Sequence, residues 1–152
     1  MGEEVKLTIT AQKKWLGLVD LTIEYIAKSL EATMAAQVAF AVREAVINAM
    51  CAAEKMAPTR ESAIDIVVCC NEEYWEIQIA DEGPGISETV LERLTTMDCA
   101  DLLWSESGRG LLYIKEYMDE YYSEKNVEGK HVFTMRKKIG GNGDGKNASR
   151  SL

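Results

Sequence analysis

Glu44 and Asn48 lie four residues apart in AVREAVINAM, residues 41–50, where Arg43 is the one other polar residue. Residues four apart on a helix are neighbours, with roughly 5–6 Å between Cβ atoms, so a carboxylate and an amide would share one small patch. Burying an unpaired carboxylate costs free energy, so this patch must meet water, a cation or polar partners. The plain alternative is a helix edge that emerges into solvent.

A second set of polar residues ends an apolar segment in IQIADEGPGI, residues 77–86. The alternation predicts a strand that finishes at Asp81, followed by Gly83 and Gly85. Glycine permits positive φ and lets the backbone approach a ligand without a Cβ in between. Asp81 would be well placed to accept a hydrogen bond from the exocyclic amine of a base, although DEGPG is also compatible with an ordinary turn.

The third set is SGRG, residues 107–110, where an irregular segment gives way to a helical pattern. Amide N–H groups in the first turn of a helix are unpaired and carry partial positive charge, which suits a chain of phosphates. Gly108 and Gly110 would also allow this segment to hinge. An ordinary junction between a loop and a helix is the alternative.

The order and separation of these three motifs are more specific than any one of them. E-x-x-x-N, then D-x-G-x-G-I, then G-x-G-L resembles the ATP-binding superfamily of DNA gyrase, histidine kinases, the 90 kDa heat-shock chaperone and the MutL proteins, known as GHKL. The motifs AVREAVINAM, ADEGPGI and SGRGLLYIKEYMDE are most similar to those of bacterial anti-sigma factor serine kinases. This resemblance covers about residues 5 to 138.

The resemblance implies a role for each motif. Glu44 would be the general base, Asn48 would hold Mg²⁺ through its carbonyl oxygen, and Asp81 would accept the adenine amine. Residues 98–110 would form a mobile lid over the phosphates. The implied catalytic residue is Glu44, the implied metal ligand is Asn48, and the implied ATP-binding residues are Asn48, Asp81, Gly83, Gly85, Ile86, Ser107, Gly108, Arg109, Gly110 and Leu111.

Three positions depart from the family pattern. Related sequences often carry a His four residues after the Asn, where this chain has Ala52, and some carry an Arg in the lid where this chain has Glu106. The last strand usually begins with Gly-Thr, but Lys130 occupies the Thr position, so that contact near the base is missing or has moved to His131. These differences bear on fast catalysis more than on nucleotide binding. Taken by itself, His131 is predicted to be structural.

The implied function is an anti-sigma factor that sequesters a sigma factor and, with ATP and Mg²⁺, phosphorylates a Ser or Thr of an anti-anti-sigma protein. The resemblance also implies a homodimer. Three alternatives stay open: a regulatory module that binds ATP without catalysis, a histidine-kinase catalytic domain acting in trans, and a structural domain that binds no nucleotide.

The spacing of apolar residues predicts the strands and helices that must position these residues. It predicts strands over VKLTIT, AIDIVVCC, EYWEIQIAD and HVFTMRKKI, and helices over residues 11–30, from a Thr33 cap to Ala53, over 87–97 with Ser87 as cap, and over 110–122. Together with these elements, the resemblance implies an α+β fold: a two-layer α/β sandwich of the Bergerat (histidine-kinase-like ATPase) type, with a mixed, mostly antiparallel sheet and helices on one face. Residues 1–138 would form the domain, and 139–152 a flexible tail.

Composition argues against a nucleic-acid-binding, membrane, secreted or zinc-binding protein. The formal net charge of −8 argues against a broad basic surface for nucleic acid. We expect no membrane segment, because no apolar stretch reaches roughly 18 residues, and the acidic N-terminus does not look like a secretory signal. The four cysteines form no CxxC pair, so a zinc site is not expected, and buried free thiols in the cytoplasm are the simplest interpretation.

Overall fold

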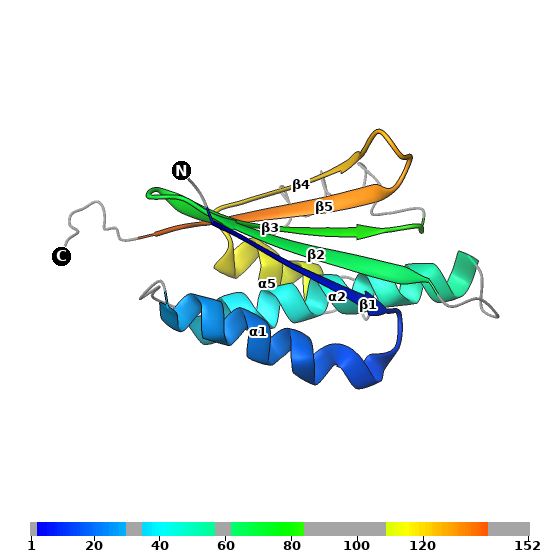
Figure 1. Cartoon of the computed structure of the whole chain (residues 1–152), viewed down its shortest axis with the longest axis horizontal. Helices are drawn as coiled ribbons and strands as arrows, with labels where there is room; N and C mark the ends of the chain where they lie inside the picture. The colour runs from blue at the N-terminus through cyan, green and yellow to red at the C-terminus, as the bar shows by residue number, and fades with distance from the viewer. Residues whose placement is uncertain (1–2, 30–34, 57–61, 84–108, 140–152) are drawn as a thin grey trace.

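The computed structural model describes residues 3–29, 35–56, 62–83 and 109–139 of the 152-residue chain. Strands and helices alternate in blocks along the described segments (Figure 1). The elements are β1 (Glu3–Thr10), η1 (Lys13–Trp15), α1 (Leu16–Ser29), α2 (Ala35–Met56), β2 (Ala63–Cys70), β3 (Tyr74–Asp81), α5 (Arg109–Tyr117), β4 (Glu120–Lys125) and β5 (His131–Lys138).

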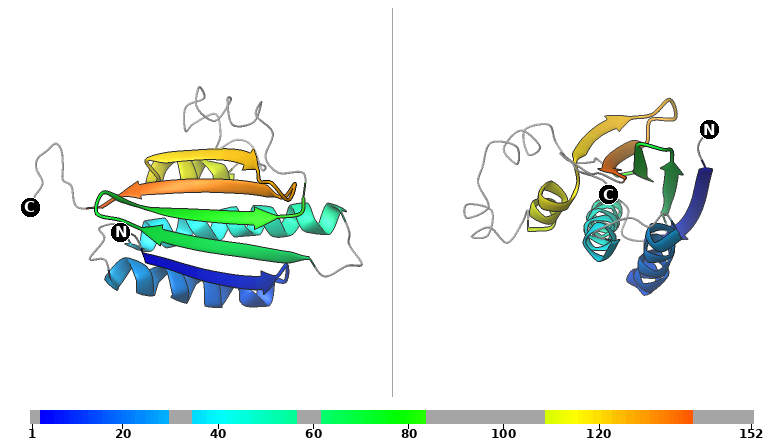
Figure 2. Two further views of the ribbon diagram at one scale, coloured as in Figure 1. Left: turned by 45° about the horizontal axis from the view of Figure 1, so that its top comes forward. Right: turned by 90° about the vertical axis from the view of Figure 1, so that its left-hand side faces the viewer.

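The five strands form one sheet in the order β1-β2-β3-β5-β4. Helices α1, α2 and α5 all lie on one face of this sheet, which makes a two-layer sandwich (Figure 2). This confirms the predicted fold class. All four pairings between the described strands are antiparallel, so the parallel component of the predicted mixed sheet is not found among them.

Strand β3 shows how the sequence creates the two faces of the sheet. Successive side chains of a strand point to opposite faces. Trp75, Ile77 and Ile79 are buried against the helix layer, whereas the residues between them are only partly buried. Asp81 continues the same alternation at the end of the strand. The strand therefore delivers a carboxylate to the helix-facing side, where the three preceding positions are apolar.

Helix α2 is the central helix, and it contacts α1, α5, β2 and β3. Within it, the stretch Ala35–Ala53 is long and apolar enough, by length and composition, to cross a membrane. The expectation that no apolar stretch reaches this length was therefore wrong. Core helices meet the same criterion, and eight apolar residues of α2 are buried in the core of this domain: Val38, Ala39, Ala41, Val42, Ala45, Val46, Ala49 and Met50.

The segment after α5 differs from the prediction. A single helix was expected over residues 110–122, but α5 ends at Tyr117, and Glu120–Lys125 form the edge strand β4. Asn126 and Gly129 shape the turn that follows, because the Asn126 side chain accepts two backbone N–H bonds and Gly129 has a φ of +81°. This turn folds β4 back onto β5, so hairpin pairing overrides the local helical pattern.

Arg136 links three strands on the face of the sheet opposite the helices. Its guanidinium donates to Glu76 on β3 at 2.6 Å and to Glu120 on β4 at 3.3 Å. It also lies over the rings of Tyr74 and Tyr122. The hydrogen bond to Glu76 raises the pKa of Arg136 above its ordinary value. This cluster joins the strand that carries Asp81 to the last hairpin.

Several predictions fall on residues outside the described segments. They are the Thr33 cap, the helix over 87–97 with its Ser87 cap, most of the lid over residues 98–110, and the tail. The division into a domain of residues 1–138 and a tail of residues 139–152 therefore stays a prediction.

The three thiols in the described segments are less buried than the sequence suggested. Cys51 is exposed, and Cys69 and Cys70 are partly buried; all three are free. The prediction of buried thiols was therefore wrong for Cys51. Burial raises the pKa of the Cys69 thiol, and its hydrogen bond to the Glu4 carboxylate raises it further. Burial also raises the pKa of Cys70.

We expect iodoacetamide near neutral pH to alkylate Cys51 well before Cys69 and Cys70. The thiolate is the reacting species, and a raised pKa lowers the thiolate fraction at a given pH, in addition to the effect of burial. Peptide mass spectrometry along a time course would measure the three rates. Equal rates at Cys51 and Cys69 would contradict the prediction, and urea-unfolded protein gives the reference rates.

Candidate functional site

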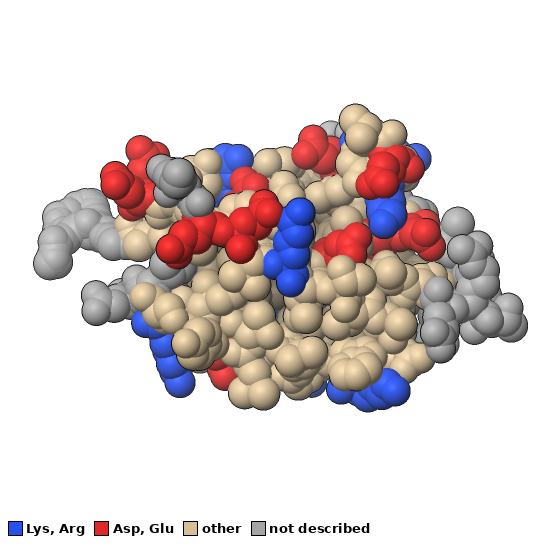
Figure 3. All heavy atoms as spheres, viewed as in Figure 1, with Lys and Arg blue, Asp and Glu red and all other residues tan. Residues whose placement is uncertain are grey.

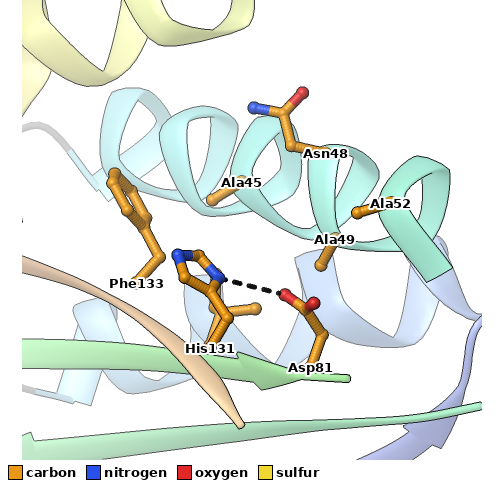
Figure 4. Close-up of a pocket in the computed structure, with 8 residues that line it drawn as sticks. Ala45, Asn48, Ala49, Ala52, Asp81, His131 and Phe133 are labelled. Atoms are coloured by element: carbon orange, nitrogen blue, oxygen red, sulfur yellow. Dashed lines mark hydrogen bonds and ion pairs between the residues drawn. The ribbon is translucent and has the colours of Figure 1, made fainter. Parts of the chain in front are cut away.

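A small pocket lies between the C-terminal half of α2 and the ends of β3 and β5 (Figure 4). Its volume is about 50 Å³, and apolar side chains form most of the wall. Three polar residues contribute the remainder. The full lining is Ala45, Asn48, Ala49, Ala52, Ile79, Asp81, His131 and Phe133.

Asp81 provides the buried carboxylate of the pocket, with a relative exposure of 3%. Its Oδ1 accepts a hydrogen bond of 2.6 Å from the backbone N–H of Gly83, which holds the turn after β3. Its Oδ2 lies 3.5 Å from Nδ1 of His131, the residue directly opposite it in the β3–β5 register. The carboxylate is therefore supported from two sides, and its oxygens retain further lone pairs for a ligand.

Gly83 passes very close to α2. A Cβ at this position would lie 2.7 Å from the Cβ of Ala52 and 2.9 Å from Oδ1 of Asp81. Real Cβ atoms do not approach other atoms so closely, so only glycine fits here without movement of its surroundings. The absence of a side chain at Gly83 is thus a requirement of the packing around the pocket.

Asn48 and Glu44 lie on the same helix but in different surroundings. The Asn48 side chain lines the pocket yet points away from Asp81 and His131 (Figure 4). Glu44 is one turn earlier and does not belong to the lining formed by the described residues. Its carboxylate instead lies beside Gly110, where an added Cβ would be 3.3 Å from Oε1. The structure therefore brings Asn48 and Asp81 to one pocket and places Glu44 between that pocket and α5.

Helix α5 is held against α2 at its first turns. The rings of Phe40 and Tyr113 meet edge to face with centroids 4.6 Å apart, and Leu111 is buried. These contacts fix the start of α5, including Gly110, beside Glu44. A carboxylate near the N-terminus of a helix interacts favourably with the helix dipole, so Glu44 also has a structural reason to be there.

The remaining predicted site residues cannot be placed. Gly85, Ile86, Ser107 and Gly108 lie outside the described residues, and for Arg109 only the backbone at the start of α5 is described.

Ser123 contacts a residue of the pocket, His131, and was not identified from the sequence. Its hydroxyl hydrogen-bonds to Nε2 of His131 at 2.5 Å. It was missed because residues 110–122 were expected to be helical, which left no strand to bring Ser123 beside the pocket. The alternation in EYYSEK, followed by the turn residues NVEG, is the signal that predicts β4.

The polar side chains of the pocket suit an organic ligand better than a tightly held metal ion. Within residues 3–29, 35–56, 62–83 and 109–139, no group of three or more His, Cys, Asp or Glu side chains could hold a metal ion. The buried carboxylate of Asp81 suits a nitrogen–hydrogen donor, and the apolar walls suit a flat ring. Asn48 offers a single amide oxygen, which is enough only for an ion that takes its other ligands from water or phosphate.

Comparison with known families agrees with this geometry. The family described as a histidine kinase-like ATPase domain matches residues 9–137, which include every described element except most of β1 and the last residue of β5. No curated protein matches the chain.

Proposed function

Because the chain belongs to the histidine kinase-like ATPase family and its domain implies ATP binding, we propose that it is an anti-sigma factor with protein-serine kinase activity. In this proposal it sequesters a sigma factor and transfers the γ-phosphate of ATP to a Ser or Thr of an anti-anti-sigma protein. The observation that carries the proposal is that Asn48 and Asp81 line one pocket while Glu44 lies one turn away beside Gly110.

Each described group has a role in the proposed reaction. Asp81 accepts the adenine amine in the pocket, and Gly83 leaves the space beside Ala52 and Asp81 free of a side chain. The hydroxyl oxygen of the partner bonds to the γ-phosphorus as the bond to the β–γ bridging oxygen breaks, which leaves ADP. Glu44 accepts the hydroxyl proton. The N-terminus of α5, at Arg109 and Gly110, directs backbone N–H groups toward the phosphates.

Mg²⁺ fits this arrangement only as an ion shared with the nucleotide. Asn48 would contribute its carbonyl oxygen, and phosphate oxygens and water would complete the octahedron that Mg²⁺ requires. Once bound, the ion would neutralise charge that develops on the phosphates.

The proposed partner chemistry can be tested by capture. Tagged protein would be used to isolate partners from the native cell with and without Mg-ATP, followed by mass spectrometry for phosphorylated residues. The proposal expects a sigma factor and a second protein that gains acid-stable phosphoserine or phosphothreonine. Acid-labile phosphohistidine would favour a histidine-kinase domain acting in trans. Partners whose release depends on ATP without any phosphorylation would favour a regulatory module.

Binding of the nucleotide is tested separately by thermal protection. A ligand present at a hundredfold excess over its Kd stabilises the folded state by about 2.7 kcal/mol. A melting temperature that does not rise with Mg-ATP would favour the structural-domain alternative. We also propose a cytoplasmic location, since sigma factors and ATP are both found there.

The proposed homodimer is supported by the surface at the β1 edge of the sheet. β1 is an edge strand, and unpaired edges can bind another strand. Beside it, Val5, Leu21 and Tyr25 are exposed at 42%, 67% and 74% and line a groove between β1 and α1, here called the β1–α1 groove. Figure 3 shows few charged side chains over the part of this face where Figure 1 places α1.

The charges on β1 favour a second copy as the occupant. If two β1 strands pair antiparallel about Val5, Glu4 of each copy lies opposite Lys6 of the other. Both residues are exposed and already share one face of the strand. Oppositely charged residues across a strand pair stabilise it, and like charges destabilise it.

We expect Lys6→Glu and Glu4→Lys each to weaken the dimer by about tenfold, because each places like charges opposite one another twice. Mixing the two variants should restore a heterodimer, and the double variant should restore a homodimer. Analytical ultracentrifugation would measure all four cases. Lys125→Glu, on the opposite edge strand β4, is the matched control and should leave the dimer unchanged. A mixture that stays monomeric would exclude this register.

A further inference from the structure

His131 occupies the one position of β5 that faces Asp81 directly. It is the first residue of β5 and pairs with Asp81, the last residue of β3. Both side chains point into the helix-facing layer and are more than nine-tenths buried. Figure 4 shows the imidazole standing beside the carboxylate beneath α2. The ring is therefore part of the pocket wall and in contact with its one buried acid.

The hydrogen bonds around the ring select one tautomer. An ionised carboxylate only accepts hydrogen bonds, so the contact between Nδ1 of His131 and Oδ2 of Asp81, 3.5 Å long, requires the proton on Nδ1. In a neutral ring Nε2 is then an acceptor. The hydroxyl of Ser123, which hydrogen-bonds to Nε2, must donate. Ser123 on β4 therefore donates to His131 on β5, and His131 donates to Asp81 on β3.

These hydrogen bonds hold the Asp81 carboxylate in one orientation. Gly83 N–H donates to Oδ1 and His131 Nδ1–H faces Oδ2, so both oxygens are contacted from within the protein. The plane of the carboxylate is then set before a ligand arrives. A preorganised acceptor discriminates between ligands more sharply than one that must turn to meet them, because reorientation costs free energy on binding.

We propose that Ser123 and His131 are positioning residues that orient Asp81 and thereby determine the preference for adenine over purines without the exocyclic amine. The proposal rests on the proposed ATP site and adds two residues to it. Inosine triphosphate is the discriminating probe, because it presents a carbonyl oxygen where ATP presents the amine. Against a fixed carboxylate this oxygen is repelled, whereas the amine donates.

The first experiment compares ATP and inosine triphosphate by titration calorimetry in a matched pair of variants. His131→Leu fills a similar volume without a donor, and His131→Asn keeps an N–H donor near the position of Nδ1. We expect His131→Leu to weaken ATP binding by about tenfold and leave inosine triphosphate binding unchanged, in proportion to the loss of one hydrogen bond to a charged group. His131→Asn should retain the preference for ATP. Equal weakening of both nucleotides by His131→Leu, or an unchanged preference, would overturn the proposal.

The second experiment needs no nucleotide and uses the fact that His131 is the chain's single histidine. ¹⁵N NMR of the protein labelled at histidine reports which ring nitrogen carries the proton. We expect the Nδ1–H tautomer in the native protein and in Ser123→Thr, and a shift toward Nε2–H in Ser123→Ala. A native ring protonated on Nε2 would overturn the proposed order of donation.

The two experiments separate the failure of this inference from the failure of the proposed function. If the native protein binds neither nucleotide, the proposed ATP site is wrong, and the tautomer still decides whether Ser123 and His131 orient Asp81. If the native protein binds ATP but discriminates equally well in Ser123→Ala and His131→Leu, the ATP site stands and the positioning role is excluded.

Discussion

Glu44→Gln is expected to reduce phosphoryl transfer to the partner by roughly 10²–10⁴-fold, the usual contribution of a general base. Glutamine has nearly the same shape but cannot accept the hydroxyl proton. ATP affinity should change little, because Glu44 lies beside Gly110 and outside the lining formed by the described residues around Asp81. Transfer of labelled γ-phosphate to the captured partner, together with calorimetry for ATP, measures both quantities.

Glu24→Gln on α1 is the matched control for the loss of one carboxylate, and its transfer rate should equal that of the native protein. The alternative is that Glu44 only stabilises the N-terminus of α5, which typically contributes about 0.3–1 kcal/mol. In that case Glu44→Gln would lower the melting temperature slightly and leave transfer intact. Transfer at the native rate would therefore assign Glu44 to structure and exclude it as the base.

Gly83→Ala is expected to weaken ATP binding by about tenfold or more and to destabilise the fold by about 1–3 kcal/mol, as overpacking usually does. The new Cβ would lie 2.7 Å from the Cβ of Ala52 and 2.9 Å from Oδ1 of Asp81. Relief of these contacts must move α2, the turn after β3, or the carboxylate, and all three shape the pocket. Calorimetry and thermal unfolding would measure the two effects.

Two further variants control for the general effect of replacing a glycine. Gly17→Ala lies on α1 with no heavy atom within 4 Å of the added Cβ, so it should keep or raise stability, since alanine favours helix more than glycine does. Combining Gly83→Ala with Ala52→Gly removes the closest contact and should recover part of the ATP affinity. If Gly83→Ala binds ATP like the native protein, the close approach to α2 has no part in binding.

Elements with a strong period could be predicted from the sequence, and the last hairpin could not. The alternation around Ile77 and Ile79 predicted β3 and its final Asp81, because burial on one face leaves a period of two in the sequence. β4 was missed because YMDEYY fits a helical period equally well. Its pairing with β5 depends on the turn at Asn126 and Gly129. The hydrophobic period of the segment before the turn carries no information about that pairing.

The residues of the site could be predicted from the sequence, but the contacts between them could not. Spacing placed Glu44 and Asn48 on one helix and Asp81 at a strand end. It could not show that Glu44 turns toward Gly110 while Asn48 lines the pocket, because those distances depend on how α5 packs against α2. The contact of His131 with Asp81 arises from the β3–β5 register, which joins residues fifty positions apart.

The place of β1 in the sheet affects how the chain is made. The strand's partner residues in β2 follow it by 53 to 67 positions, from Thr10–Ala63 to Glu3–Cys70. At synthesis rates of about 5–20 residues per second, the ribosome needs roughly 3–13 seconds to supply them. Over that interval β1, in which Val5, Leu7 and Ile9 alternate with charged and polar residues, has no partner strand. Nascent chains stalled shortly before residue 63 should therefore be the species most readily captured by chaperones.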